Sequence, residues 1–194
     1  MIAKHVPMKS VAKSDFASLV QYLCDTQHKQ ERLGWVAVTN CHSETPDAAA
    51  KEVLATQACN TRAKSDRTYH LIVSFRPGEQ VGEMTCRAVE ARLCDGLGLG
   101  AHQRVSALHY DTDSLHLHIA IDKIHPTRYT IHNPYYDHPK LGQLCTELER
   151  EYRLQPDNHC PRQRGAACRA ADMERHGGLV SLLGWIRREC QDQI

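Results

Sequence analysis

Three histidines lie close together in a stretch that reads as two β-strands joined by a short turn. His116 and His118 open a run that alternates polar and apolar side chains, which is typical of a half-buried strand. Side chains two apart on a strand share a face, so His116, His118 and Asp122 should point one way. His109 ends the preceding apolar stretch, and a hairpin would bring it back beside the pair. We expect a candidate divalent-metal site with open coordination positions.

These histidines also have an ordinary interpretation. A lone His-x-His on a strand more often satisfies a hydrogen bond or lies half-exposed than binds a metal. The third histidine favours the metal interpretation, as do Asp111 and Asp113 in the turn, since carboxylates beside ligand histidines orient their rings.

The composition sets wide bounds on function. The chain of 194 residues suits one domain with a substantial core, and 24 Lys and Arg against 23 Asp and Glu neither indicate nor exclude a nucleic-acid partner. Nine cysteines, an odd number without Cys-x-x-Cys, indicate reduced thiols in a cytoplasmic protein. The sequence predicts no signal peptide and no membrane insertion.

The hydrophobic periodicity predicts the order β-α-β-α-β-α-β-β-α, with Ser14 capping the first helix and Thr45 the second. The expected strands are 2–6, 35–39, 69–75, 104–110 and 116–124, and the expected helices are 14–25, 46–58, 84–97 and 141–154. Because the last two strands form a hairpin, we predict an α+β fold with a central antiparallel sheet of about five strands and flanking helices, not a dinucleotide-binding fold.

The chain is predicted to divide at residue 155. Residues 1–155 would form the sheet domain, and residues 156–194 a C-terminal extension. The extension begins polar and basic and ends in an amphipathic helix at 179–190, which would pack on the sheet domain or complete it.

Three motifs support a family resemblance: Ser18-Leu19-Val20-Gln21-Tyr22-Leu23, Thr68-Tyr69-His70-Leu71-Ile72-Val73-Ser74-Phe75, and the stretch 109–126. With them the chain resembles the relaxase domain of conjugative and mobilisable plasmids, the P-type (MOBP) class within the HUH endonuclease superfamily. The third motif is specific, and the similarity covers essentially the whole chain. It implies that residues 1–155 are a relaxase catalytic domain.

The resemblance implies a reaction. A relaxase nicks one DNA strand at nic in the origin of transfer. A tyrosine attacks the scissile phosphate, becomes joined to the 5′ end and leaves a 3′ hydroxyl, and the strand is rejoined after transfer. The implied partners are single-stranded and supercoiled origin DNA, accessory relaxosome proteins and the coupling protein of type IV secretion. The implied location is the cytoplasm of the donor cell, from which the protein travels with the DNA.

The resemblance also assigns roles. Tyr22 matches the nucleophile, which periodicity alone would place at a helix edge, and the three histidines match the metal triad. Ser74 would hold the 3′ side of the nick, and otherwise is an ordinary strand-end serine. Asp111 would orient a histidine or help to accept the tyrosine proton, and otherwise caps the turn. Magnesium or manganese is the metal that the family implies, although three imidazoles also suit zinc.

Residues in loops and at strand ends are candidate DNA contacts, although any one such residue is more often a solvated surface charge. The candidates are Asn60, Arg62, Arg76, Arg104, Lys123 and Arg128. Tyr129, Tyr135 and Tyr136 are candidate platforms for base stacking.

Two alternatives stay open. A rolling-circle replication initiator of the HUH superfamily would share the chemistry, but its tyrosine usually follows the His-x-His strand, whereas Tyr22 precedes it. A DNA-binding module that has lost catalysis would not need Tyr22, Ser74 and three histidines. The sequence leaves open whether the chain is a truncated domain or a short full-length protein.

Overall fold

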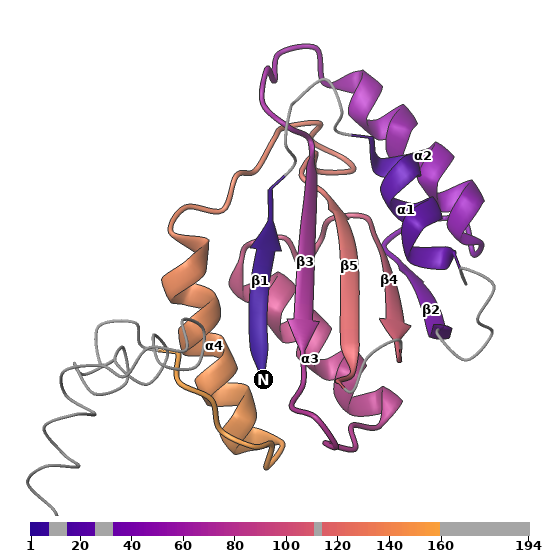
Figure 1. Ribbon diagram of the computed structural model, residues 1–194. Helices are drawn as coiled ribbons and strands as arrows, with labels where there is room; N and C mark the ends of the chain where they lie inside the picture. Colours follow the sequence, from indigo (N-terminus) through magenta and orange to yellow (C-terminus); the bar gives the residue numbers. More distant parts are fainter. Residues whose placement is uncertain (8–14, 26–32, 111–113, 160–194) are drawn as a thin grey trace, which may run out of the picture. The chain divides into compact units, whose positions relative to one another are not determined.

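A single antiparallel sheet of five strands forms the centre of the protein in the computed structural model, which describes residues 1–7, 15–25, 33–110 and 114–159 (Figure 1). In chain order the strands are β1 (Ile2–Val6), β2 (Leu33–Thr39), β3 (Thr68–Ser74), β4 (Arg104–His109) and β5 (His116–Asp122). Their order across the sheet is β1-β3-β5-β4-β2, and each neighbouring pair is antiparallel. The predicted element order and the antiparallel α+β fold are confirmed.

Helices cover both faces of the sheet (Figure 1). The helices α1 (Phe16–Cys24) and α2 (Pro46–Cys59) contact β5, β4 and β2 on one face. The helices α3 (Glu83–Gly96) and α4 (Asp137–Glu151) pack on the other face, where α4 also contacts β1. On the first face, α1 and α2 leave β1 and β3 without a covering helix (Figure 1).

Two of the four described helices, α1 and α2, begin at a side chain that accepts a hydrogen bond from a backbone amide of the first turn. Asp15 accepts a hydrogen bond from the Ala17 amide and begins α1, one residue after the expected cap at Ser14. Thr45 caps α2 through the Ala48 amide, with Pro46 in the first turn, as expected. No side-chain cap bond begins α3 or α4.

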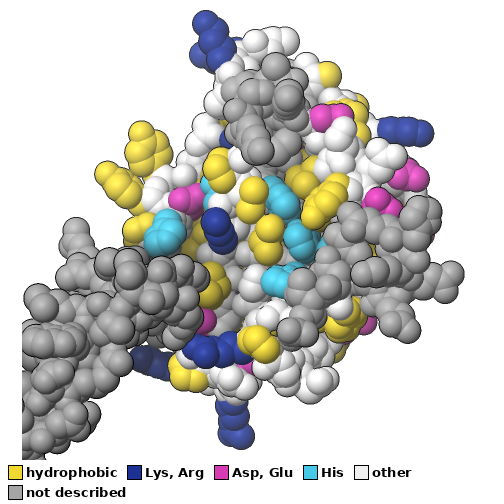
Figure 2. Space-filling model, viewed as in Figure 1, with side chains coloured by type: hydrophobic (Ala, Val, Ile, Leu, Met, Phe, Trp, Pro, Cys, Tyr) yellow, Lys and Arg dark blue, Asp and Glu magenta, His cyan; other side chains and the backbone are white. Residues whose placement is uncertain are grey.

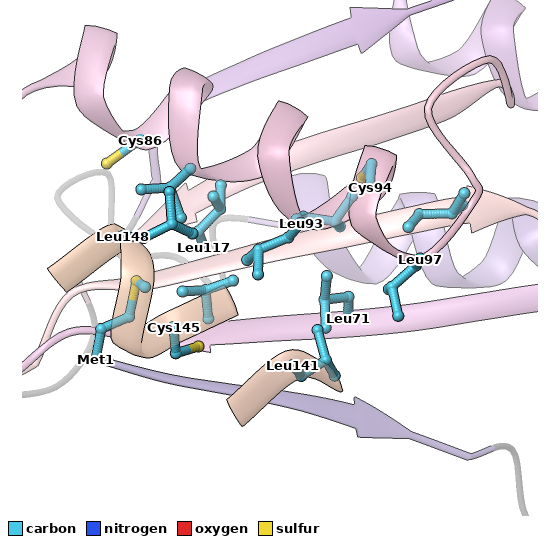
Figure 3. Packing of buried hydrophobic residues seen from close by; sticks show 14 of the residues in the cluster. Met1, Leu71, Cys86, Leu93, Cys94, Leu97, Leu117, Leu141, Cys145 and Leu148 are labelled. Carbon is cyan, nitrogen blue, oxygen red and sulfur yellow. The ribbon is translucent and has the colours of Figure 1, made fainter. Parts of the chain in front are cut away.

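Two apolar cores lie between the sheet and the helices, one on each face of the sheet. The larger core joins the sheet to α3 and α4, and Figure 3 shows Leu71 and Leu117 of the sheet packed against Leu93 and Leu148 of these helices. The smaller core joins α1 and α2 to the sheet through Phe16, Leu19, Val20, Leu23, Ala49, Ala50, Val53, Val105, Ala107 and Ala120. The expected apolar face of the first helix, Phe16, Leu19, Val20 and Leu23, is the buried face of α1.

A buried carboxylate on α4 binds the start and the end of the described fold. Glu149 accepts hydrogen bonds from the Met1 ammonium at 2.7 Å and from the Asp157 amide at 3.2 Å, and its Oε1 lies 2.9 Å from His159 Nε2. The compact unit formed by these contacts runs from Met1 to His159. The division at residue 155 stays a prediction, and the expected helix at 179–190 lies outside the described residues. Within the described ranges, no helix is long and apolar enough to cross a membrane.

Candidate active site

The site begins with a row of three polar side chains across the middle strands. His109 of β4 pairs with His116 of β5, and His116 pairs with Ser74 of β3. Cross-strand partners point to the same face of an antiparallel sheet. The hairpin therefore brings His109 beside the His-x-His pair, as the sequence predicts. Ser74 joins the row from a strand more than thirty residues earlier in the chain.

A second row lies one pleat along the same face. His118 lies between Ala107 of β4 and Ile72 of β3, and its ring centroid is 4.6 Å from that of His109 and 6.4 Å from that of His116. Figure 2 shows histidine side chains gathered on the sheet face that α1 and α2 leave partly uncovered. The three imidazoles of the predicted triad are thus neighbours on one surface.

Tyr22 reaches this surface from α1. Leu19 and Leu23 bury the face of the helix next to it, whereas the Tyr22 side chain is 46% exposed. Its ring stands edge-on to His118 with the centroids 6.3 Å apart. The phenol is therefore open to a substrate while it lies against the histidine cluster.

A main-chain contact ties the helix of Tyr22 to the triad. His109 Nε2 lies 2.8 Å from the carbonyl oxygen of Leu23, the residue after Tyr22. Because a carbonyl can only accept, His109 carries its proton on Nε2, which puts the ring's lone pair on Nδ1. One ring thus contacts the last turn of α1 through Nε2, and Nδ1 is the nitrogen that it could offer to a metal.

The other two rings also have protein partners. His116 Nδ1 lies 2.9 Å from Ser74 Oγ, and His118 Nδ1 lies 3.3 Å from His70 Nε2. Engagement of one imidazole nitrogen by the protein sets the tautomer and orientation of a ligand histidine. All three rings of the triad have such a contact.

The donor set suits a divalent ion, but the side chains as they stand do not enclose one. Three neutral imidazoles are ligands for zinc, manganese or cobalt. In the part of the chain that the structure describes, no three His, Cys, Asp or Glu side chains surround a common point at coordination distance. An ion would have to draw the rings together. Asp111 lies outside the described residues, so its expected role stays a prediction.

The other tyrosine on the neighbouring strand cannot replace Tyr22. Tyr69 is fully buried in β3, and its hydroxyl donates to Asp137 at 2.8 Å. Burial, followed by the hydrogen bond to Asp137, raises the pKa of Tyr69 far above that of an ordinary phenol. A buried phenol that holds its proton so firmly is not a nucleophile, whereas the Tyr22 ring is exposed and lies edge-on to His118.

Three of the candidate DNA contacts are buried in the fold. Arg104 is buried and donates from Nε to Glu90 at 2.7 Å and from Nη1 to the Gly100 carbonyl. Asn60 accepts from the amides of Arg62 and Ala63 and donates to the Tyr129 carbonyl, so it holds the loop after α2. These bonds already use the polar groups that the sequence analysis assigned to DNA.

Lys123 is the third of these residues. Its side chain is buried beyond the end of β5, and burial lowers the pKa of its ammonium. Because it is buried, it is poorly placed for a phosphate. DNA contacts from Arg104, Asn60 and Lys123 stay a prediction, for which these three side chains would have to leave their buried positions.

The remaining cationic candidates are exposed. Arg62 and Arg128 lie in loops at the solvent surface. Arg76 lies next to Ser74 in the chain, and both line a pocket of about 360 Å³ with Ile2, Phe75, Pro77, Ser114 and Asp157. Its guanidinium donates to the Pro156 carbonyl at 3.1 Å and lies 3.4 Å from an Asp157 carboxylate oxygen. Of the six candidates, Arg76 is the one that shares a pocket with a residue of the site.

His70 also lies at the site, although its sequence motif gave it no role. Its side chain is buried on the triad's face of β3, and burial, with the nearby charge of His5, lowers its pKa to about 4, so the ring is neutral near pH 7. The signal was present, because His70, Ile72 and Ser74 alternate along one strand and share the face of Ser74. What the sequence could not show was that β3 pairs with β5.

Asp122 was expected on the face of His116 and His118, and the structure places it there, at the far end of β5. Its Oδ1 accepts from Gln57 of α2 and from the Ile124 amide, both at 3.0 Å. The carboxyl is fully buried, and this burial raises its pKa to about 7. It takes part in packing α2 on the sheet and does not join the triad.

Comparison with known proteins gives the family of the chain. A family model described as relaxase, MobA/VirD2-like, nuclease domain matches residues 22–154. Two proteins of Escherichia coli, each named protein TraI, are 64% and 60% identical over all 194 residues, and the chain spans 26% of the length of each. Protein MobA of Acidithiobacillus ferrooxidans is 41% identical over 61 residues, which are 31% of this chain and 15% of that protein.

The matched residues begin at Tyr22 and continue past the histidine hairpin into the loop that follows α4. They therefore contain every described element of the tyrosine and histidine surface except the first part of α1. The chain belongs to the family of MobA/VirD2-like relaxase nuclease domains.

Proposed function

We propose that this domain nicks one strand of plasmid DNA at nic in the origin of transfer and later rejoins it, with Tyr22 as the nucleophile. The observation that carries the proposal is the docking of the Tyr22 helix on the histidine surface. The Leu23 carbonyl binds His109, and the Tyr22 ring lies edge-on to His118. An exposed phenol beside three imidazoles is suited to attack on a phosphate.

The proposed step exchanges one ester bond for another. The Tyr22 oxygen attacks the scissile phosphorus, a bond from phosphorus to the phenolic oxygen forms, and the bond to the 3′ oxygen breaks. The phenolic proton passes to a base, for which the resemblance offers Asp111, and the leaving 3′ oxygen takes up a proton. The product is a 5′-phosphotyrosyl strand and a 3′ hydroxyl, and the reverse step rejoins the strand.

His109, His116 and His118 would hold a divalent ion, for which magnesium or manganese is proposed. Bound there, it would supply Lewis-acid chemistry toward the scissile phosphate. The chain's own contribution is to orient the three rings through Leu23, Ser74 and His70. Metal dependence is part of the proposal, as is the identity of the ion.

Ser74 and Arg76 are proposed to hold the 3′ side of the nick. Ser74 lies in the same row as His116, and the pocket that it shares with Arg76 opens beside that row. A guanidinium can pair with a backbone phosphate at such a place, which positions the strand without reading its sequence. The half-exposed Ser74 hydroxyl can do the same for the 3′ oxygen.

The substrates and partners are also proposals, because the chain spans about a quarter of its TraI relatives. We propose single-stranded and supercoiled origin DNA as substrates, with accessory relaxosome proteins and the coupling protein of type IV secretion as partners. The proposed place of action is the cytoplasm of the donor cell, and the protein would be carried with the DNA into the recipient.

A denaturing gel of the protein with single-stranded oligonucleotides that tile the origin region tests the proposal. We expect a species with protein joined to the 5′ end of one fragment, present with manganese and absent with chelator. Tyr22→Phe should abolish this species and leave DNA binding within a few-fold, because only the nucleophilic oxygen is lost. His116→Ala should weaken cleavage and manganese affinity together.

Tyr152→Phe is the matched control, since it removes a phenolic oxygen at the end of α4, on the other face of the sheet. It should cleave like the unaltered protein. If the protein bound the oligonucleotides but formed no covalent species on any of them, it would be a DNA-binding module without catalysis.

A further inference from the structure

We propose that His70 is a positioning residue, which accepts a hydrogen bond from His118 and so holds the His118 proton on Nδ1. The inference rests on the proposed function, because it concerns how a ligand of the proposed ion is prepared. His70 lies in the motif at residues 68–75, where the resemblance assigns a role to Ser74 and none to His70. The structure brings it to the site through the pairing of β3 with β5.

The contact between His70 and His118 is buried, and it joins one nitrogen of each ring. His70 Nε2 lies 3.3 Å from His118 Nδ1, and the rings lie 5.5 Å apart with a 27° angle between their planes. Only 7% of His70 and 8% of His118 is exposed. Two neutral imidazoles at this distance form a hydrogen bond only when one nitrogen carries a proton and the other does not. The contact therefore allows two arrangements: His118 donates from Nδ1, or it accepts there from Nε2 of His70.

Ion binding decides which tautomer is useful. A metal-ligating imidazole nitrogen must present its lone pair. With the proton on Nδ1, His118 donates to His70 and presents Nε2, which points away from His70, to the ion. With the proton on Nε2, the same ring could not bind through that nitrogen. His70 would thus do for His118 what the Leu23 carbonyl does for His109, with the nitrogens exchanged.

The tautomer can be read without any metal. We would record nitrogen-15 chemical shifts of the His118 ring in the metal-free protein at neutral pH, for the unaltered chain and three variants. His70→Leu removes the acceptor. His70→Gln offers an amide oxygen near the position of Nε2 and should restore the bond. Ile72→Val changes the packing directly opposite His118 and removes no polar group, so it is the matched control.

We expect His118 to carry its proton on Nδ1 in the unaltered protein, in His70→Gln and in Ile72→Val, and to lose this preference in His70→Leu. Manganese affinity, measured by calorimetry, should fall roughly 10–100-fold in His70→Leu, the effect typical of losing such a partner, and stay within a few-fold in the other two variants. A general loss of packing would lower stability in Ile72→Val and His70→Leu alike without changing the tautomer.

The opposite results are equally clear. Protonation of His118 on Nε2 in the unaltered protein would overturn the inference, and this measurement does not depend on whether His70→Leu folds. An unchanged tautomer and manganese affinity in folded His70→Leu would overturn it as well. Absence of cleavage by an unaltered protein with the expected tautomer would instead count against the proposed nicking function, so the two failures can be told apart.

Discussion

The buried carboxyl group of Asp122 makes the stability of the protein depend on pH. Asp122 Oδ1 is satisfied by Gln57 and the Ile124 amide, but its buried Oδ2 has no hydrogen-bond donor in the described structure. Burial raises its pKa from 3.8 to about 7. Between these values the folded chain binds the proton and the unfolded chain does not, so this group lowers the free energy of unfolding as the pH rises.

Asp122→Asn should remove this effect, because an amide keeps the shape and has no charge to bury. At pH 8 we expect the free energy of unfolding to rise on the order of 2–4 kcal/mol, and at pH 4 to change little. Urea unfolding at the two pH values measures the difference. Glu44→Gln, at an exposed carboxylate, serves as the control and should show no such pH dependence. A gain of the same size at both pH values would mean that ionisation of Asp122 is not its cause.

At the scale of residues, the sequence predicted well where a motif specifies spacing and poorly where partners come from distant segments. Spacing along one hairpin was enough to bring His109 to His116. Arg104, by contrast, is a candidate DNA contact because it lies at a strand end near the proposed site, and nothing near it in sequence reveals its ion pair with Glu90. His70 was missed for the same reason, since its partner His118 lies on another strand.

At the scale of elements, the short helix α1 depends on its first turn. Asp15 accepts hydrogen bonds from the Ala17 amide at 3.0 Å and from the Ser18 hydroxyl at 2.6 Å. A helix of nine residues has little stability of its own, so its ends matter. The far end is held by the bond from His109 to Leu23, and Tyr22 lies just before that bond.

Asp15→Ala should lower the free energy of unfolding by about 1 kcal/mol, the usual effect of losing a cap. It should also slow nicking several-fold, because α1 would fray while carrying the nucleophile. Thr45→Ala removes the cap of α2 and should give a similar loss of stability with no change in nicking. Urea unfolding and initial cleavage rates test both variants. Equal slowing by the two would show that α1 has no special part in the reaction.

The limits of helix prediction are visible at the ends of these elements. Thr45 followed by Pro46 is a strong start signal, and α2 begins there. The start of α4 was expected four residues too late, because Tyr136, in a left-handed conformation with φ 51°, offers no polar cap to recognise. The order of elements was recovered because apolar periodicity extends over whole helices and strands, whereas each end depends on one or two residues.

At the scale of the whole molecule, the strand order decides which contacts can form early. Of the sheet pairings that the structure describes, β4 with β5 is the one that joins strands consecutive in the chain. The edge strand β1 pairs with β3, and the edge strand β2 pairs with β4; in each case two helices and a strand lie between the partners in the chain. Closing a short loop costs less entropy than closing a long one.

Folding should therefore begin at the hairpin. In pulse-labelling hydrogen exchange during refolding, we expect the amides of β4 and β5 to be protected first and those of β1 and β2 later. Earlier protection of β1 would contradict this order. Since α1 packs on β4 and β5 together, the surface that it packs against does not exist until the hairpin has formed. The imidazoles would be assembled first, and the tyrosine would arrive at a surface already built to receive it.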